Sequence, residues 1–339
     1  MVNKMDRQPP LFSILIVCWN NRQTISACLE ALCSQTIQDF EVILVDNGST
    51  EPIPADLPSR YPQLTIQFFT LAHNTGFAQG NNYAAEKASA DTLILLNADA
   101  FPAQGWLEAI RKGIHDHPGC FYTSRLVMAE APERMDGMGD VYHASGLAWR
   151  RDHYKLANSE HDHEREVFSA CGAAAVYPAE AYRQAKGFDE DYFAYQEDVD
   201  LGFRLQLMGY RCIYLPQAVV RHVGSASTSD RSDFSVYYGQ RNLVWTFFKD
   251  MPGVFVWLLW PYHLLANALM IMVGLTRGQG RLTLQAKWDA LLKLPFVLRK
   301  RRQVQKTRKA SLFQVLRRMD WSPVSPFSKL LNSSRRLRK

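Results

Sequence analysis

Cysteine is scarce in this sequence and is absent from the arrangements in which it usually carries chemistry. The 339 residues include six cysteines, and no two of them form a Cys-x-x-Cys pair. Because most of them stand inside apolar runs, the pattern predicts buried thiols in a reducing compartment and argues against a disulfide framework. The short polar stretch 1–10 contains no apolar core of the kind found in signal peptides, so we expect a cytoplasmic N-terminal domain.

Two phosphate-binding signatures are also missing. The segment 74–82 (NTGFAQGNN) does not spell Gly-x-Gly-x-x-Gly, which gives little support to a nicotinamide-binding domain. No glycine- and lysine-rich triphosphate loop stands near the first apolar run, which counts against a nucleotidyltransferase. Segment 74–82 still links a strand to a helix, so its backbone N–H groups could face an anion. The alternative is a glycine-rich helix start.

Charge is distributed unevenly along the chain. Residues 277–339 carry 18 Lys and Arg against two acidic residues, a net charge of +16, whereas residues 1–276 have a net charge of −10. A basic tail of this kind predicts an anionic partner, either a membrane surface or a nucleic acid. The stretch 291–302 (LLKLPFVLRKRR) mixes Leu, Phe and Val with its basic residues, which favours an anionic bilayer over a nucleic acid.

Short apolar runs alternate with segments of helical periodicity over residues 13–115. This alternation predicts βαβ units and an α/β domain with a mostly parallel sheet. The expected strands are 13–19, 41–45, 65–70 and 92–96, and the expected helices are 24–34, 77–90 and 106–115. The later pattern predicts a hairpin near 142–150, a strand at 171–177, a helix over 199–208 ending at Gly209, strands at 212–215 and 219–222, and a helix over 241–275.

Asn97 and Asp99 follow a buried strand with one residue between them. Ligands of α/β sheets bind at the carboxyl ends of strands, and a carboxylate there can hold Mg²⁺ or Mn²⁺ against two phosphates. The alternative is a turn in which both side chains cap the following helix. His222 ends a later strand and could serve as a metal or phosphate ligand, although a lone histidine is more often structural.

A second acidic cluster, Glu197-Asp198-Val199-Asp200, follows the aromatic run 192–195. Acidic groups favour a helix N-terminus, and Asp200 and Arg204 have the i, i+4 spacing of an ion pair. That structural interpretation accounts for Asp200 but not for the aromatic run. Aromatic walls exclude water from a carboxylate and raise its pKa, as a general base requires. The cluster is therefore a candidate source of a general base, and Asp198 is favoured over Asp200 because Arg204 can pair with Asp200.

In this order, the motifs resemble those of the inverting nucleotide-sugar transferases of glycosyltransferase family 2, and most closely of their rhamnosyltransferase-like branch. The resemblance covers residues 12–227 and implies the GT-A fold, with a transferase domain over 1–230 and a helical, basic extension over 231–339. The motifs that carry it are IVCWNNR (16–22), VDNGS (45–49), NTGFAQGNN (74–82), LLNAD (95–99), GFDE (187–190), EDVDLGFR (197–204) and RHVGS (221–225).

The resemblance also implies roles for individual residues. The donor-site residues would be Trp19, Asn20, Asp46, Asn74, Gly76, Asn81 and Asn97, with Asp46 bonded to the nucleotide base. Asn97 and Asp99 occupy the Asp-x-Asp position, where this branch commonly has Asn first, and Asp99 and His222 would bind Mg²⁺ or Mn²⁺. Asp198 would be the base, supported by Glu197, and Phe188 and Asp189 would lie in the acceptor-side loop.

The implied reaction is transfer of a sugar, with inversion, from a nucleotide-sugar donor to a glycan or lipid-linked glycan during surface polysaccharide synthesis. L-Rhamnose from dTDP-rhamnose is one candidate. Two other functions stay open. A non-catalytic sugar-nucleotide-binding or membrane scaffold protein would account for Asn97 and the basic tail, and a nucleotidyltransferase would also be α/β and metal-dependent.

The apolar segment 254–275 is close to the ~20 residues that a membrane-spanning helix needs. A single span followed by a cytoplasmic basic tail would place the transferase domain outside the cell, away from cytoplasmic nucleotide sugars. We therefore expect an interfacial or re-entrant segment, with residues 252–339 on the anionic inner face of the cell membrane and the enzyme peripherally attached there. The alternative is a buried helical pair that packs on the transferase domain.

Overall fold

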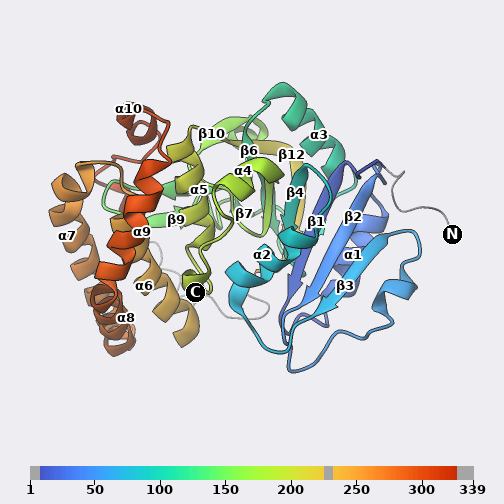
Figure 1. Cartoon of the computed structure of the whole chain (residues 1–339), viewed down its shortest axis with the longest axis horizontal. Coiled ribbons are helices and arrows are strands. Elements are labelled where there is room, and N and C mark those ends of the chain that lie inside the picture. The colour runs from blue at the N-terminus through green and yellow to red at the C-terminus, as the bar shows by residue number, and fades with distance from the viewer. Residues whose placement is uncertain (1–7, 225–231, 327–339) are drawn as a thin grey trace.

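The computed structural model describes residues 8–224 and 232–326. Its first half is a parallel sheet in which β1 (Phe12–Cys18) lies between β4 (Thr92–Leu96) and β2 (Phe40–Asp46), and β3 (Thr65–Thr70) forms the edge (Figure 1). The predicted alternation of strands and helices is confirmed. Strands β1, β2 and β4 are almost continuously apolar because helices cover both faces of the sheet.

The two faces of the sheet are covered by different helices. Helices α1 (Ile25–Cys33) and α3 (Trp106–Asp116) share one core with alternate residues of β1, β2 and β4. The opposite face of the sheet is covered by α2 (Gly76–Lys87), α4 (Ala179–Gln184) and α5 (Glu197–Met208). These helices pack on the intervening residues of β1, β2 and β4. Because β1, β2 and β4 are parallel, their carboxyl ends lie at the same edge of the sheet, between the two layers of helices.

The second half of the sheet is mixed. Strand β11 (Ala174–Pro178) runs antiparallel to its neighbours β4 and β6 (Phe121–Met128), and β12 (Cys212–His222) runs parallel to β6. Three short strands complete the sheet: β5 (Ala100–Pro102), β7 (Met135–Gly137) and β10 (Arg165–Val167). The predicted hairpin is confirmed as β8 (Asp140–Tyr142) and β9 (Ala148–Arg150).

Three predicted elements are wrong in their bounds. The strands expected at 212–215 and 219–222 form one strand, β12, whose register shifts between Leu215 and Val219. Pro216 lies in that shift and has no N–H to donate to the ladder, so the strand bulges rather than ends. The single helix expected over 241–275 is two helices.

Helices α6 (Asp233–Asp250) and α7 (Phe255–Thr276) are separated by a short break. Pro252 interrupts the backbone hydrogen bonds there, and Gly253 has φ of 54°, a left-handed conformation that suits glycine. The described chain then continues through α8 (Gly280–Leu292), α9 (Leu294–Lys306) and the short α10 (Leu312–Leu316). These helices gather at one end of the molecule, beside α5 (Figure 1).

The C-terminal helices share a core with the sheet-containing part. Tyr142 and Phe203 belong to the same buried cluster as Phe247 and Val256. The change from sheet to helices falls between β12 and α6. The predicted boundary at residue 230 and the end of the predicted resemblance at residues 225–227 lie outside the described residues, as does the end of the basic tail, 327–339.

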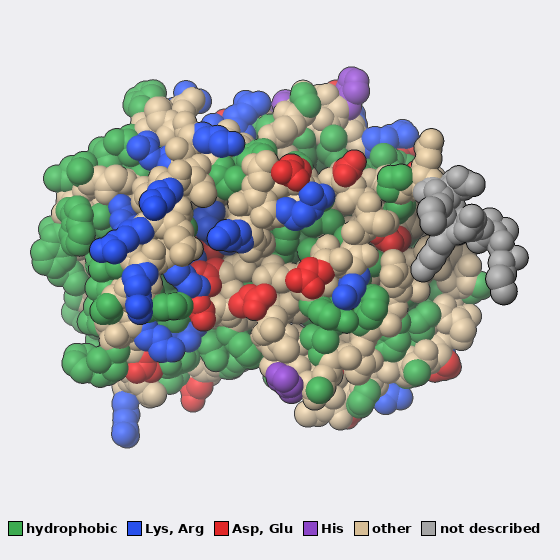
Figure 2. Space-filling model, viewed as in Figure 1, with side chains coloured by type: hydrophobic (Ala, Val, Ile, Leu, Met, Phe, Trp, Pro, Cys, Tyr) green, Lys and Arg blue, Asp and Glu red, His purple; other side chains and the backbone are tan. Residues whose placement is uncertain are grey.

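Helix α7 leaves most of its surface uncovered. It is long and apolar enough to cross a membrane, and only 22% of its most apolar stretch is buried. Trp257 and Leu258 are 59% and 65% exposed, and Trp288 of α8 is 63% exposed. The alternative expectation of a buried helical pair is therefore wrong for α7. Figure 2 shows basic side chains in a stripe over α9 beside this apolar surface.

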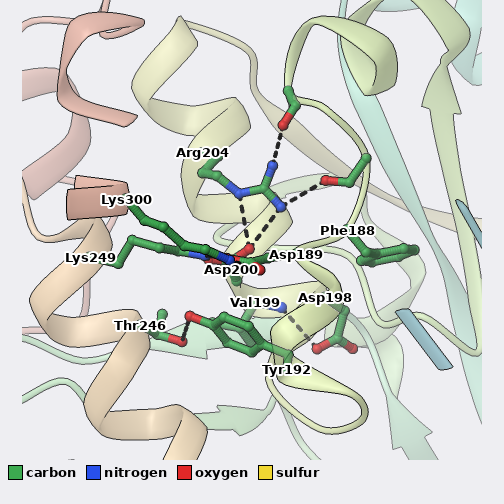
Figure 3. Close-up of polar contacts among 12 residues, drawn as sticks. Phe188, Asp189, Tyr192, Asp198, Val199, Asp200, Arg204, Thr246, Lys249 and Lys300 are labelled. Atoms are coloured by element: carbon green, nitrogen blue, oxygen red, sulfur yellow. Dashed lines mark hydrogen bonds and ion pairs between the residues drawn. The ribbon is translucent and has the colours of Figure 1, made fainter. Parts of the chain in front are cut away.

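A buried ion cluster joins α6 and α9 to α5 and to the loop before it (Figure 3). Lys249, which is 2% exposed, donates to Asp189 at 2.6 Å and pairs with Asp200. Arg204 donates to Asp200 at 2.7 and 2.9 Å, which confirms the predicted i, i+4 pair, and Lys300 pairs with Asp189. Each carboxylate here faces cations from two segments of the chain.

Replacing Lys249 with methionine should lower the free energy of unfolding by about 3 kcal/mol or more, because the change leaves buried carboxylates short of a partner. Urea denaturation of the full chain measures this. The matched control is Lys112→Met, which breaks an ion pair of a lysine that is 72% exposed and should cost less than about 1 kcal/mol. Equal losses in the two variants would contradict the role given to the cluster.

Candidate active site

A cavity of about 350 Å³ opens where β1 and β4 end and α5 begins. Its volume is in the range of small-molecule sites. Eight of the eleven site residues predicted from the sequence lie in the wall of this cavity: Trp19, Asn74, Gly76, Asn97, Asp99, Glu197, Asp198 and His222.

Asn47 shapes the end of the cavity nearest the segment 74–76. Its Oδ1 accepts hydrogen bonds from the Thr75 backbone N–H at 3.0 Å and the Thr75 hydroxyl at 2.9 Å, and its Nδ2 donates to the Gly76 carbonyl at 3.0 Å. Gly76 has φ of 86°, and a Cβ atom there would lie 2.5 Å from the Phe193 carbonyl oxygen. Position 76 therefore needs glycine, as the motif implied.

The other three predicted residues, Asn20, Asp46 and Asn81, lie outside the wall of the cavity. Asp46 accepts from the backbone N–H groups of Ser49 and Ile53, at 3.1 and 2.8 Å. Each carboxylate oxygen accepts one of these bonds and can still accept a further one from a nucleotide base.

Asn20 and Asn81 also bond to the protein itself. Asn20 Oδ1 accepts from the backbone and the hydroxyl of Thr50, both at 2.9 Å. Asn81 donates to the Phe77 carbonyl within its own helix at 2.9 Å. These side chains hold the loops around the cavity in shape.

Asp99 and His222 face each other in the cavity. His222 Nε2 lies 3.3 Å from Asp99 Oδ1 and 3.4 Å from Asn97 Nδ2. On the other side of the ring, His222 Nδ1 lies 2.8 Å from Asp136 Oδ2. Burial alone would lower the pKa of His222, but its hydrogen bonds to Asp136 and Asp99 outweigh burial and raise the pKa to about 9.

This arrangement fits a divalent cation. A carboxylate that accepts the Nδ1–H of a histidine leaves Nε2 as the ligand atom, which is the usual support of a metal-binding histidine. Over residues 8–224 and 232–326, no three His, Cys, Asp or Glu side chains converge as one metal-binding group. Asp99 and His222 would thus supply two ligands, and phosphate oxygens and water would fill the remaining positions.

Asp198 lies across the cavity at the start of α5. The backbone N–H of Gly172 donates to its Oδ2 at 3.0 Å. The backbone N–H of Val199 donates to its Oδ1 at 2.8 Å (Figure 3). Burial raises the pKa of Asp198 above its ordinary value. Burial, followed by the charge of Asp198, raises the pKa of Glu197 well above its ordinary value.

Several residues of the site were missed in the sequence. Asp140, Trp149 and Arg150 line the cavity, and Arg150 donates to Asp136 at 2.7 Å. All of them come from strands within residues 129–166, a polar stretch with weak periodicity. The hairpin itself was predictable, but no sequence signal showed that it folds over the ends of β1 and β4.

A family model confirms the resemblance. The model described as glycosyl transferase family 2 matches residues 13–183, half of the chain. The chain belongs to glycosyl transferase family 2. A relative in this family, the N-acetylglucosaminyl-diphospho-decaprenol L-rhamnosyltransferase of Mycobacterium tuberculosis, is 28% identical over 242 residues, which cover 63% of this chain and 76% of the relative.

Solved structures confirm the GT-A fold of this family 2 member. The S. aureus TarS 1-349 structure in complex with UDP-GlcNAc superposes with a TM-score of 0.57 at 15% identity, covering 90% of this chain and 89% of TarS 1-349. The mannosyltransferase PcManGT from Pyrobaculum calidifontis, in complex with GDP-Man and Mn²⁺, gives a TM-score of 0.53 at 17% identity, covering 88% and 86%. Both superpositions extend over C-terminal helices of this chain as well as over the sheet.

The pKa of Asp140 should make the stability of the enzyme depend on pH. Burial, followed by the charge of Asp198, raises this pKa from 3.8 to about 7. Between these values the unfolded chain releases a proton that the folded chain keeps, so wild-type stability falls as pH rises through this window. Asp140→Asn carries no such proton, and its stability relative to wild type should rise by about 1 kcal/mol or more from pH 5 to pH 7.5.

Urea denaturation at several pH values measures this difference. Asp56→Asn is the control: hydrogen bonds from Arg60 lower the pKa of the exposed Asp56 below its ordinary value, so the effect of this substitution should stay constant across the same window. A constant difference between Asp140→Asn and wild type would show that Asp140 titrates normally.

Proposed function

We propose that this family 2 enzyme transfers a sugar, with inversion, from a nucleotide-sugar donor to a lipid-linked glycan, and that L-rhamnose from dTDP-rhamnose is the first donor to test. One observation carries the proposal: a single cavity holds both the Asp99–His222 pair and the Glu197–Asp198 pair. The mycobacterial relative, whose name specifies L-rhamnosyl transfer to a decaprenol-linked diphosphosugar, supports this choice of donor and acceptor.

Asp198 acts as the general base. Two backbone N–H groups fix its carboxylate, and its raised pKa brings it closer to the pH at which proton transfer is most efficient. It accepts the proton of the acceptor hydroxyl as that oxygen attacks the anomeric carbon. One displacement, without a covalent intermediate on the enzyme, inverts the anomeric configuration.

Glu197 is suited to bind a substrate group. Among the described residues, its Oε2 is buried without a hydrogen-bond partner, and the side chain lines the cavity. Burial and the charge of Asp198 raise its pKa and so favour the protonated form, which can donate a hydrogen bond to a substrate hydroxyl. This bond would place the acceptor or the donor sugar beside Asp198.

Asp99 and His222 hold the leaving-group end of the donor. A bound Mg²⁺ or Mn²⁺ would supply positive charge to the diphosphate. Arg150 is the cationic side chain of the cavity wall that stays charged at all relevant pH values. Four carboxyl groups also line this wall, Asp99, Asp140, Glu197 and Asp198, and those that ionise repel an anionic donor, which a divalent cation would offset.

Two substitutions should separate binding from transfer. Asp198→Asn should lower kcat by about 10²–10⁴-fold while donor binding stays within twofold, because the amide cannot accept the proton. Asp99→Asn should instead abolish the Mn²⁺-dependent part of donor binding. Calorimetric titration with dTDP-, UDP- and GDP-sugars and a transfer assay on a polyprenyl-diphosphate-linked sugar measure both effects.

Asp162→Asn is the control, since Asp162 is an exposed partner of Arg125 and does not line the cavity. Full donor binding with no transfer by wild type on any lipid-linked acceptor would favour the scaffold function. Pyrophosphate release from a nucleoside triphosphate would indicate a nucleotidyltransferase.

We also propose that α7, α8 and α9 bind the cytoplasmic face of an anionic membrane. Residues 254–276 contain no Asp, Glu, Lys or Arg. The exposed apolar side chains are Val254, Trp257, Leu258, Trp260, Leu264, Leu265, Met272 and Leu275 on or beside α7, and Leu284, Trp288, Leu291 and Leu292 on α8. Exposed Arg299 and Arg302 on α9 add positive charge beside them (Figure 2).

The variant Trp257→Ser/Leu264→Ser/Leu265→Ser should lose at least tenfold in affinity for phosphatidylglycerol-containing vesicles, because each side chain that enters the bilayer contributes about 1.5–3 kcal/mol. Vesicle flotation measures the affinity. The control Leu11→Ser/Leu156→Ser removes two leucines that are 40% and 59% exposed elsewhere and should bind like wild type. Binding that 1 M salt abolishes completely would show that charge alone holds the protein on the membrane.

A further inference from the structure

The backbone just before the catalytic carboxylates is strained. Phe193, Tyr195 and Gln196 have φ of 66°, 66° and 68°, and they are three of the seven non-glycine residues with positive φ in the described part of the chain. Side chains other than glycine rarely adopt this conformation, and such residues persist only where surrounding contacts hold them. The turn 193–196 therefore needs a support outside itself.

Asn242 of α6 supplies that support. It is fully buried, and its Nδ2 lies within hydrogen-bond distance of three backbone carbonyl oxygens of the turn: Tyr192 at 3.0 Å, Ala194 at 2.9 Å and Tyr195 at 2.7 Å. Its Oδ1 accepts from Arg241 Nε at 2.9 Å. This bond fixes the amide orientation, since the oxygen faces Arg241 and both N–H groups face the turn.

Arg241 and Thr246 hold the start of the same segment. Arg241 Nη2 donates to the carbonyl oxygens of Asp191 and Tyr192 at 2.8 and 3.1 Å. The guanidinium lies over the ring of Trp245, 4.2 Å from its centroid. One turn further along α6, Thr246 Oγ1 lies 3.1 Å from the Tyr192 hydroxyl (Figure 3). One face of α6 thus carries most of the bonds to this segment.

The turn has a neighbour on each side that matters for transfer. The Phe193 carbonyl accepts from the Ala78 backbone N–H at 3.2 Å and lies against Gly76, so it contacts the glycine-containing segment of the cavity wall. At its other end, Gln196 leads directly into Glu197 and Asp198. The conformation of the turn therefore sets the position of Asp198 relative to segment 74–78.

We propose that Asn242 is a positioning residue for sugar transfer: its amide holds the strained turn 193–196 and thereby fixes Asp198 against the donor. The inference rests on the proposed function of Asp198. Asn242 lies beyond residues 13–183, which the family model matches. Asparagine suits the task because its amide nitrogen is a neutral donor. An aspartate of the same shape would present a carboxylate to three carbonyl oxygens.

The test compares Asn242→Asp and Asn242→Ala with wild type in the full chain. Because small displacements of a catalytic group are costly, kcat should fall roughly 10–100-fold in both variants, while the Kd of the nucleotide-sugar donor stays within twofold. The matched control is Asn267→Asp, another buried asparagine of the C-terminal helices, whose Nδ2 donates to the His263 carbonyl of its own helix at 2.7 Å. Its kcat should stay within twofold of wild type.

A second substitution distinguishes positioning from general support of the fold. Glycine adopts positive φ without cost, so Gln196→Gly should reduce the need for Asn242. The fold-loss in kcat caused by Asn242→Ala should be at least threefold smaller in the Gln196→Gly background than in wild type, an interaction that a double-mutant cycle measures. An equal loss in both backgrounds would overturn the proposal, and so would a fully active Asn242→Asp.

Hydrogen exchange tests, in the absence of substrate, whether Asn242 stabilises the turn 193–196. Backbone amides of residues 192–199 should exchange roughly tenfold faster in Asn242→Asp than in Asn267→Asp, and unchanged exchange would overturn the proposal whether or not the protein transfers a sugar. Conversely, a wild-type protein with no transfer contradicts the proposed function alone. The two failures are therefore distinguishable.

Discussion

The buried pairing of Lys249 with Asp189 and Asp200 is the contact on which the arrangement of this enzyme depends. It joins Lys249 of α6 to Asp189, in the loop before the turn 193–196, and to Asp200 of α5. Because the charges are buried, no one of them can lose its partners without a large cost, so α6 cannot move independently of α5. The GT-A sheet supplies the floor of the cavity, and the C-terminal helices hold its far wall.

Charge in the cavity supports the different tasks that we propose for its carboxyl groups. Asp198 is held by two backbone N–H groups, whereas the Oε2 of Glu197 lacks such support within the described structure and burial raises the pKa of that residue. Adjacent carboxyl groups in one enclosed space do not all ionise, and their surroundings decide which one keeps its charge. The carboxylates that do ionise support our proposal that a divalent cation accompanies the diphosphate.

Local patterns predicted more of this structure than distant contacts did. The strands of the first half and the Asp200–Arg204 pair follow from periodicity and from i, i+4 spacing, which act within one element. Asp136 could not be predicted, because its partner His222 is 86 residues away and they meet only where β7 and β12 flank β6. The bonds from Ser49 and Ile53 to Asp46 were likewise not predicted, since the sequence did not show that loop 49–53 folds against its carboxylate.

Helix α6 connects the proposed membrane surface to the turn 193–196. On its outer side, Tyr237 donates to Asp289 of α8 at 2.7 Å, and Lys287 of α8 donates to the Gln240 carbonyl at 2.8 Å. Asn242 bonds to the turn only two residues after Gln240. An acceptor anchored in a bilayer can reach Asp198 only if the cavity keeps a fixed orientation to that bilayer. A direct bonded path from α8 through α6 to the turn provides such an orientation, which a flexible tether between the membrane anchor and the catalytic domain would not.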